Sequence, residues 1–138
     1  MPFTGPIEHR SAIRDLYDSY ADSANRGDRE AWLACWSEDA VWWTHYFEVT
    51  GKAAIRAQHV ALMASVETTS FLTQIGSIEV EGDRAKGRAF CMERLIMTTG
   101  GSHRLTGRYE DDLLRVDGAW LFARREYNVM IEELPEAS

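Results

Sequence analysis

The sequence is poor in cysteine, with only Cys35 and Cys91 among its 138 residues. Small secreted domains usually depend on several disulfides, and two cysteines this far apart do not form such a framework. We therefore expect two buried thiols. The first residues also lack a basic start followed by an apolar block, so no signal peptide is expected. Together these absences predict a protein of the reducing cytoplasm.

Long hydrophobic runs and basic clusters are missing as well. No apolar stretch approaches the roughly 20 residues of a membrane-spanning helix, and the formal net charge is −7 without a Lys/Arg cluster. These features argue against membranes and nucleic acid as partners. Histidines and carboxylates do not cluster at metal-ligand spacing, and no glycine-rich phosphate loop is present. We therefore predict neither a metal site nor a bound cofactor.

The first half of the sequence has helical periodicity, and the length predicts one domain over residues 1–138. A helix is predicted from Pro6 to the stop signal Asn25-Arg26-Gly27. Asp28 is predicted to cap a short second helix that reaches Trp36. A third helix is predicted after Gly51. The apolar faces of the first and third helices are formed by Ile13, Leu16, Tyr17, Tyr20 and Ala24, and by Ile55, His59, Leu62 and Val66.

The second half predicts strands over residues 70–80 and 84–97 and from His103 onwards, in addition to an earlier strand over 41–49. Residues 103–113 alternate strictly between two faces, and Asp117-Gly118 is a strong signal for a tight hairpin turn. Helices followed by antiparallel strands predict an α+β fold.

Several short motifs resemble the SnoaL-like members of the nuclear-transport-factor-2-like superfamily. The motifs run almost end to end and comprise residues 13–17, 25–28, 36–42, 51–55 and 81–85 together with the C-terminal hairpin. The resemblance implies a curved, mostly antiparallel sheet wrapped around the N-terminal helices, forming a cone with an apolar pocket. It also implies a homodimer formed through the outer face of the sheet, where we expect Phe90, Met92 and Ile96.

The resemblance further implies a catalytic Asp–His pair, as in scytalone dehydratase and a dehydrochlorinase, and a base Asp as in ketosteroid isomerase. In this sequence the corresponding positions fall on Asn25, Ser70 and Thr44. None of these residue types can act as a general base in the same way. The sequence therefore predicts that the usual dyad is absent.

Glu93 is the strongest remaining candidate for acid–base chemistry. It shares a strand face with small residues such as Ala89 and Cys91, which predicts a position on the concave side of the sheet. Burial there would raise the pKa of the carboxyl into the range of a general acid or base. An ion pair at the cavity rim is the alternative. Tyr20 and Asn25 are predicted to be hydrogen-bond donors beside Glu93.

The other predicted site residues are expected to contact the ligand, with Trp42 forming a flat apolar wall. They are Tyr17, Trp42, Thr44, His59, Ser70, Tyr109 and Glu126. In the last strand, alternation allows either Arg124 with Glu126 or Arg125 with Tyr127 to face inward. Asp111 could also lie inside, although a salt bridge at the end of a strand is the preferred interpretation.

Three functions remain open at this stage. One is a cofactor-independent lyase, isomerase or hydrolase acting on a small apolar organic molecule, cyclic, terpenoid or aromatic. Another is a non-catalytic ligand-binding or accessory protein that has lost the dyad. A purely structural oligomerisation module is a third possibility.

Overall fold

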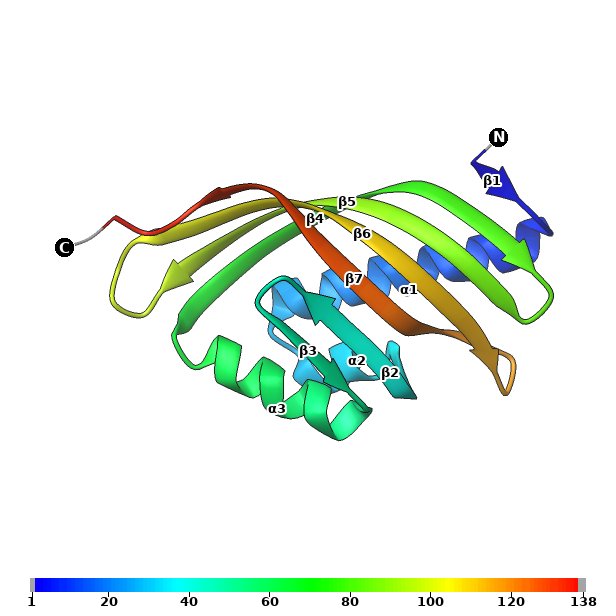
Figure 1. Cartoon of the computed structure of the whole chain (residues 1–138), viewed down its shortest axis with the longest axis horizontal. Helices are drawn as coiled ribbons and strands as arrows, with labels where there is room; N and C mark the ends of the chain where they lie inside the picture. The colour runs from blue at the N-terminus through cyan, green and yellow to red at the C-terminus, as the bar shows by residue number, and fades with distance from the viewer. Residues whose placement is uncertain (1, 137–138) are drawn as a thin grey trace.

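The computed structural model describes residues 2–136 of the chain. Along the sequence the elements are β1 (Phe3–Thr4), α1 (Ile7–Arg26), α2 (Arg29–Leu33), β2 (Trp36–Thr44), β3 (Phe47–Thr50), α3 (Lys52–Met63), β4 (Val66–Glu81), β5 (Arg84–Met97), β6 (Ser102–Val116) and β7 (Ala119–Glu133). Figure 1 shows the long strands β4–β7 arching over the helices.

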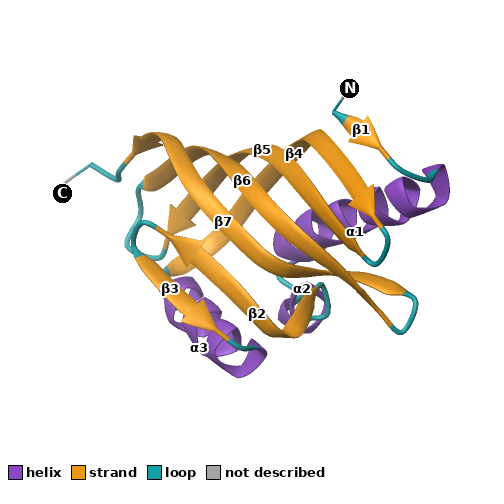
Figure 2. Ribbon diagram, turned by 45° about the vertical axis from the view of Figure 1, so that its right-hand side comes forward, coloured by secondary structure: helices purple, strands orange, loops and turns teal. Residues whose placement is uncertain are grey.

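One sheet of seven strands forms the whole β layer, in the order β1-β4-β5-β6-β7-β2-β3. The pairs β1–β4 and β2–β7 are parallel and the other pairs are antiparallel. The three helices lie on the concave side of this curved sheet (Figure 2). The predicted α+β cone with a mixed, mostly antiparallel sheet is therefore confirmed.

Two local sequence signals have the predicted structural outcome. Asp117 and Gly118 both have positive φ angles, 49° and 83°, and join β6 to β7 in a two-residue turn. Asp28 caps α2, since its carboxylate accepts a hydrogen bond of 3.1 Å from the backbone N–H of Ala31.

Three element boundaries differ from the prediction. The second helix ends at Leu33, and Trp36 begins β2 instead, because the Cys35 carbonyl accepts from the backbone N–H of Phe122 in β7. Residues 41–49 are not one strand but the hairpin β2–β3, which turns at residues 45–46. The third helix stops at Met63, and the β-branched Val66 opens β4 before the predicted start at Ser70.

A β-bulge in β7 decides which side chains of that strand face the helices. The register with β6 shifts between Asp112↔Arg124 and Leu113↔Phe122, so one residue of β7 is left unpaired. Phe122 and Arg125 are consequently both buried although they lie three positions apart. Of the two alternatives left open by the sequence, Arg125 with Tyr127 is the inward pair.

Two glycines allow tyrosines to approach the concave face of the sheet. A Cβ built on Gly87 of β5 would lie 2.2 Å from the Tyr17 hydroxyl oxygen, and one on Gly107 of β6 would lie 2.0 Å from a ring carbon of Tyr127. Glycine is thus required at both positions for the tyrosine rings to pack against the backbone. Cys35 and Cys91 are buried free thiols, as predicted.

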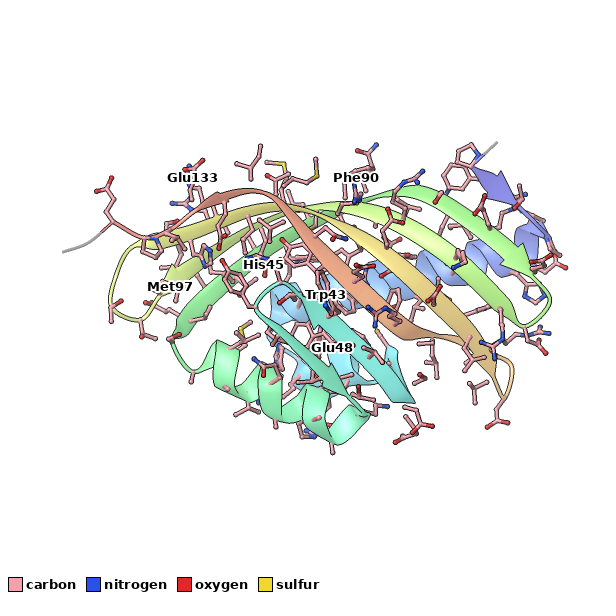
Figure 3. All side chains as sticks on the ribbon, in the orientation of Figure 1. Trp43, His45, Glu48, Phe90, Met97 and Glu133 are labelled. Atoms are coloured by element: carbon pink, nitrogen blue, oxygen red, sulfur yellow. The ribbon has the colours of Figure 1, made fainter. Side chains whose placement is uncertain are left out.

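The outer face of the sheet carries exposed apolar side chains. Leu72, Met92 and Ile131 are each at least 60% exposed, and they lie in one row across β4, β5, β6 and β7. Phe90 lies on the same side, away from the helices (Figure 3). The homodimer through this face remains a prediction. No helix within residues 2–136 is long and apolar enough to cross a membrane.

Candidate functional site

A cavity of about 250 Å³ lies between the concave face of the sheet and helices α1–α3. Its walls are largely aromatic and aliphatic, which is the usual lining of a small-molecule site. The aromatic walls are formed by Tyr20, Trp32, Trp42, Phe71, Tyr109 and Tyr127. Side chains occupy the space between the sheet and the helices (Figure 3).

Glu93 of β5 is the carboxylate that lines this cavity. Its cross-strand neighbours are Phe71 and Leu105, both apolar and buried. No arginine, lysine or hydrogen-bond donor within residues 2–136 pairs with it. Burial raises the pKa of Glu93 from its ordinary value of 4.5 to about 7. A carboxyl group with this pKa can both accept and donate a proton near neutral pH.

Three tyrosines surround the cavity on the sheet and helix sides. Tyr109 stacks on Tyr127 with ring centroids 4.8 Å apart, and Tyr20 meets Tyr109 edge to face at 6.4 Å. Burial raises the pKa of Tyr20 to about 12, so its phenol keeps its proton. The phenols therefore offer donors, not additional charges, to a bound molecule.

An ion pair is buried beneath this aromatic layer. The Arg125 guanidinium donates to both oxygens of Asp111, at 2.9 and 3.0 Å, and the Tyr17 hydroxyl donates to the same carboxylate at 2.5 Å. The guanidinium carbon lies 3.7 Å from the ring centroid of Tyr109 and 4.4 Å from that of Tyr20. Neither Arg125 nor Tyr17 lines the cavity, so Tyr17 supports the floor of the cavity and does not contact its contents.

The interior position of Asp111 is a correction to the sequence interpretation, which preferred a salt bridge at the end of a strand. The bulge in β7 brings Arg125 directly opposite Asp111 in the β6–β7 register. Burial alone would lower the pKa of Arg125, but the facing Asp111 carboxylate raises it above its ordinary value. Arg125 therefore stays charged, and the pair is structural.

His59 of α3 lies in the wall of the cavity. Its ring stacks on Trp32 with centroids 4.3 Å apart, and its Nδ1 accepts a hydrogen bond of 2.9 Å from Arg29 Nε. Burial, and then the nearby charge of Arg29, lower the pKa of His59 to about 4. The imidazole is consequently neutral at physiological pH.

Trp42 and Thr44 of β2 line the cavity in the places that the sequence suggested. Trp42 is buried edge to face against Phe47, with ring centroids 4.9 Å apart. The Thr44 hydroxyl accepts from the backbone N–H groups of Tyr46 and Phe47, at 3.0 and 3.3 Å. Thr44 therefore closes the β2–β3 turn as well as facing the cavity.

Asn25 does not line the cavity, and its amide is fully engaged elsewhere. It accepts from the Phe71 backbone N–H at 2.7 Å and donates to the Phe71 carbonyl at 2.7 Å, with a further bond to the Ala21 carbonyl at 2.9 Å. These bonds attach the end of α1 to β4. The residues that face the cavity at this point are Ala24 and Phe71.

Ser70 and Glu126 also lie outside the cavity. Ser70 is exposed because side chains alternate along β4, and its neighbours Thr69 and Phe71 point inward instead. Glu126 lies on the outer side of β7 because the bulge turns Arg125 and Tyr127 inward. Of the predicted ligand contacts, the structure therefore brings together Tyr20, Trp42, Thr44, His59, Glu93 and Tyr109.

The cavity also has a polar edge that sequence patterns did not reveal. Glu132 of β7 accepts from Tyr46 Oη at 2.5 Å and lies 2.7 Å from His103 Nε2, and both partners line the cavity. Tyr46 belongs to the β2–β3 turn and His103 to the start of β6. These contacts hold the hairpin against the ends of the long strands.

No group of three His, Cys, Asp or Glu side chains in the described part of the chain is arranged to hold a metal ion. The polar groups that face the cavity are tyrosine, threonine and serine hydroxyls, two imidazoles and the Glu93 carboxyl. These groups suit hydrogen bonding and proton transfer.

Comparisons with known proteins agree with this architecture. A profile of the SnoaL-like domain matches residues 6–126, whereas no curated protein matches the sequence. A Novosphingobium aromaticivorans protein provisionally assigned as an aromatic ring hydroxylase has a TM-score of 0.88 at 26% identity, covering 94% of this chain and 95% of that chain. A second protein of that organism, provisionally assigned as a scytalone dehydratase, has a TM-score of 0.86 at 23% identity, covering 96% and 91%.

A type 2 hexachlorocyclohexane dehydrochlorinase is also similar, with a TM-score of 0.80 at 20% identity over 95% of this chain and 90% of that chain. Another similar structure is described as having a cystatin-like fold. Similarity at such low identity establishes the shared fold alone. The profile match spans most of the sequence and confirms the resemblance inferred from its motifs. The chain belongs to the SnoaL-like family, within the nuclear-transport-factor-2-like superfamily.

Proposed function

We propose that the protein catalyses proton transfer within a small, neutral, largely apolar molecule, as a lyase or isomerase, with Glu93 as general base and acid. The observation that carries this proposal is a carboxyl group without a counter-charge, lining an aromatic cavity, with its pKa raised to about 7. General bases are most effective when their pKa lies near the working pH. Structural relatives named as a dehydratase and a dehydrochlorinase support the same reaction type.

The lining of the cavity favours an uncharged substrate. No lysine or arginine lines it, so a carboxylate or phosphate would face Glu93 without a compensating cation. The volume of about 250 Å³ suits a molecule of one or two fused rings. Tyr20 and Tyr109 provide hydroxyl donors for an oxygen substituent on such a molecule.

In the proposed step, the ionised Glu93 carboxylate removes a proton from a carbon of the substrate. The C–H electron pair forms a carbon–carbon double bond. In a lyase, a leaving group departs from the adjacent carbon with its bonding electrons. In an isomerase, the π pair of an existing neighbouring double bond is displaced to its far carbon, which takes the proton back from Glu93. Glu93 alternates between its two protonation states in both cases.

A non-catalytic binding protein is the second candidate. It is favoured by the positions at the end of α1 and in β4, where Ala24 and Phe71 face the cavity and the Asn25 amide binds the backbone. A binder would keep the cavity and its donors and would perform no turnover.

The test is turnover of a panel of neutral cyclic ketones, alcohols and halides, followed by gas chromatography of the products. We expect Glu93→Gln to lower kcat for any converted compound by about 10²–10⁴-fold. Glu126→Gln, a carboxylate on the outer side of β7, is the matched control and should leave kcat unchanged. Turnover that survives Glu93→Gln contradicts the proposed role, and saturable binding of panel compounds without turnover supports the binding protein.

A further inference from the structure

The side chain of His59 is held by two groups from α2. Its ring stacks on Trp32, 4.3 Å between centroids and 27° between planes, and Arg29 Nε donates to its Nδ1 at 2.9 Å. The stacking defines the plane of the imidazole, and the hydrogen bond defines its rotation within that plane. His59 is thus oriented from the helix opposite its own.

The partner of Nδ1 determines where the proton of His59 lies. A guanidinium group has donors and no acceptor, so Nδ1 must keep its lone pair, and the neutral ring carries its proton on Nε2. A second proton would place an N–H of the imidazole against an N–H of Arg29. Burial and the charge of Arg29 oppose that second proton, consistent with the lowered pKa of His59.

Nearby carboxylates do not offset the lowering of the pKa of His59 by burial and by Arg29. Asp28 is bonded to Arg26 and Glu30 to Arg56. Glu67 of β4 lines a shallow hollow beside the α1–α2 junction, which His59 also borders. Within residues 2–136, none of these three carboxylates forms an ion pair with His59.

The two hollows that His59 borders indicate which edge of the ring faces the ligand. Arg29 lines the shallow hollow and does not line the cavity that contains Glu93, whereas His59 lines both. The Nδ1 edge of the ring therefore faces Arg29 and the shallow hollow. The opposite edge, which includes Nε2, is the one available to the cavity.

We propose that His59 donates a hydrogen bond from Nε2 to a carbonyl oxygen of the ligand, and that Arg29 is the positioning residue that fixes the imidazole in this tautomer. The ligand would then be a small cyclic ketone or a related carbonyl compound. The catalytic part of this inference rests on the proposed function of Glu93. When Glu93 removes a proton from the carbon beside the carbonyl, the electron pair forms a carbon–carbon double bond, and the carbonyl π pair moves to the oxygen that His59 binds. Where the ketone has a carbon–carbon double bond next to the deprotonated carbon, the oxygen pair re-forms the carbonyl, the new double bond shifts by one position, and the π pair of the original double bond takes the same proton from Glu93 at its far carbon.

The tautomer is measured directly by NMR of protein labelled with 15N-histidine, with His59→Phe identifying the signals among the four histidines. We expect a neutral Nε2–H form of His59 that persists to below pH 5. Arg29→Met should produce a mixture of tautomers and a higher pKa, and Arg29→Lys, which keeps a donor, should retain the Nε2–H form. Arg84→Met, which alters an exposed arginine of β5, is the control and should change nothing.

The ligand contact is measured by titrating the wild type with indan-1-one and with indane, which share a ring system and differ in the carbonyl oxygen. We expect indan-1-one to bind about 3- to 10-fold more tightly, the effect of one net hydrogen bond. His59→Phe keeps an aromatic ring against Trp32 without the donor and should abolish the difference. Glu93→Gln should leave the difference in place.

An Nδ1–H tautomer in the wild type, or a tautomer unchanged by Arg29→Met, overturns the role of Arg29. Equal affinity for the two compounds overturns the role of His59. Either result is independent of whether Glu93→Gln abolishes turnover. Conversely, turnover that survives Glu93→Gln while the preference for the ketone persists contradicts the proposed function alone.

Discussion

Asp111 of β6 and Glu93 of β5 are carboxylates on the same concave side of one sheet, but their surroundings are opposite. Asp111 accepts two hydrogen bonds from Arg125 and one from Tyr17. Glu93 lies between apolar neighbours and has no partner among residues 2–136, and burial is the cause of its raised pKa. The two regions differ in partners and not in the chemical group that they contain.

This difference separates a structural carboxylate from a reactive one. A buried charge is tolerated when its partner and its hydrogen bonds are supplied by the protein, and it then has little capacity left for a ligand. A carboxyl without such partners keeps both its proton affinity and its free oxygens. The proposed function therefore involves Glu93, while Asp111 and Arg125 support the aromatic layer on which the ligand would lie.

The largest expected effect comes from removing the partner of Asp111. Arg125→Met should lower the free energy of unfolding by about 3–5 kcal/mol, because it leaves a buried carboxylate uncompensated. Urea denaturation at pH 7 measures this loss. The double variant Arg125→Met/Asp111→Leu, which removes both charges, should recover most of it. If the single variant is as stable as the wild type, the ion pair does not support the floor.

Neutralising Glu93 should raise the free energy of unfolding, whereas Arg125→Met should lower it. The pKa of Glu93 is near 7 in the folded protein and near 4.5 in the unfolded chain, so the folded state binds more protons between these values. Wild-type stability is therefore lost as the pH rises from about 4.5 to 7, and the loss stays constant above pH 7. Glu93→Gln should consequently be more stable than the wild type by about 1–3 kcal/mol at pH 8 and equal to it at pH 4.

Denaturation curves at the two pH values check this prediction, with Glu126→Gln as the control on the outer face. A Glu93→Gln variant that is less stable than the wild type at pH 8 would show that the carboxylate has a stabilising partner. The distinction between a partnered Asp111 and an unpartnered Glu93 would then be wrong.

The smallest expected effect concerns the tyrosines next to each carboxylate. Tyr17→Phe removes one of the bonds to Asp111 and should cost about 1–1.5 kcal/mol. Tyr127→Phe, near Glu93, removes only a weak contact of 3.6 Å with Cys91 Sγ and should cost less than about 0.5 kcal/mol. Thermal unfolding of the two variants side by side tests the difference, and equal losses would contradict it.

The fold was predictable because its signals are local. Strict alternation over 103–113, small residues on one face of 84–97 and the Asp117-Gly118 turn each specify strand geometry within a few residues. The same alternation placed Glu93 and Tyr109 on the inner face. Boundaries such as the start of β2 at Trp36 depend on pairing with β7, a contact that is distant in sequence, and local patterns did not reveal it.

The site was predictable only in part, for two physical reasons. Ser70 was placed by resemblance, and an offset of one residue in a strand exchanges an inward side chain for an outward one, so Phe71 faces the cavity instead. Asn25 belongs to the correct end of α1, but hydrogen bonding with the Phe71 backbone could not be inferred from residue type. The Arg29–His59 bond joins separate helices and likewise left no local pattern.

The bulge in β7 determines which deletions during evolution would alter the floor of the cavity. Up to Phe122 the even-numbered residues of the strand face inward, and from Arg125 to Val129 the odd-numbered residues do, before a second register shift turns Ile131 outward. Deleting Ala123 would remove the bulge, and because Arg125 would then follow Phe122 by two positions, plain alternation would keep Arg125 and Tyr127 inward. A relative with a one-residue gap at this point would therefore keep the same cavity floor, whereas a relative of the same length without the bulge would turn the residues at positions 124 and 126 inward.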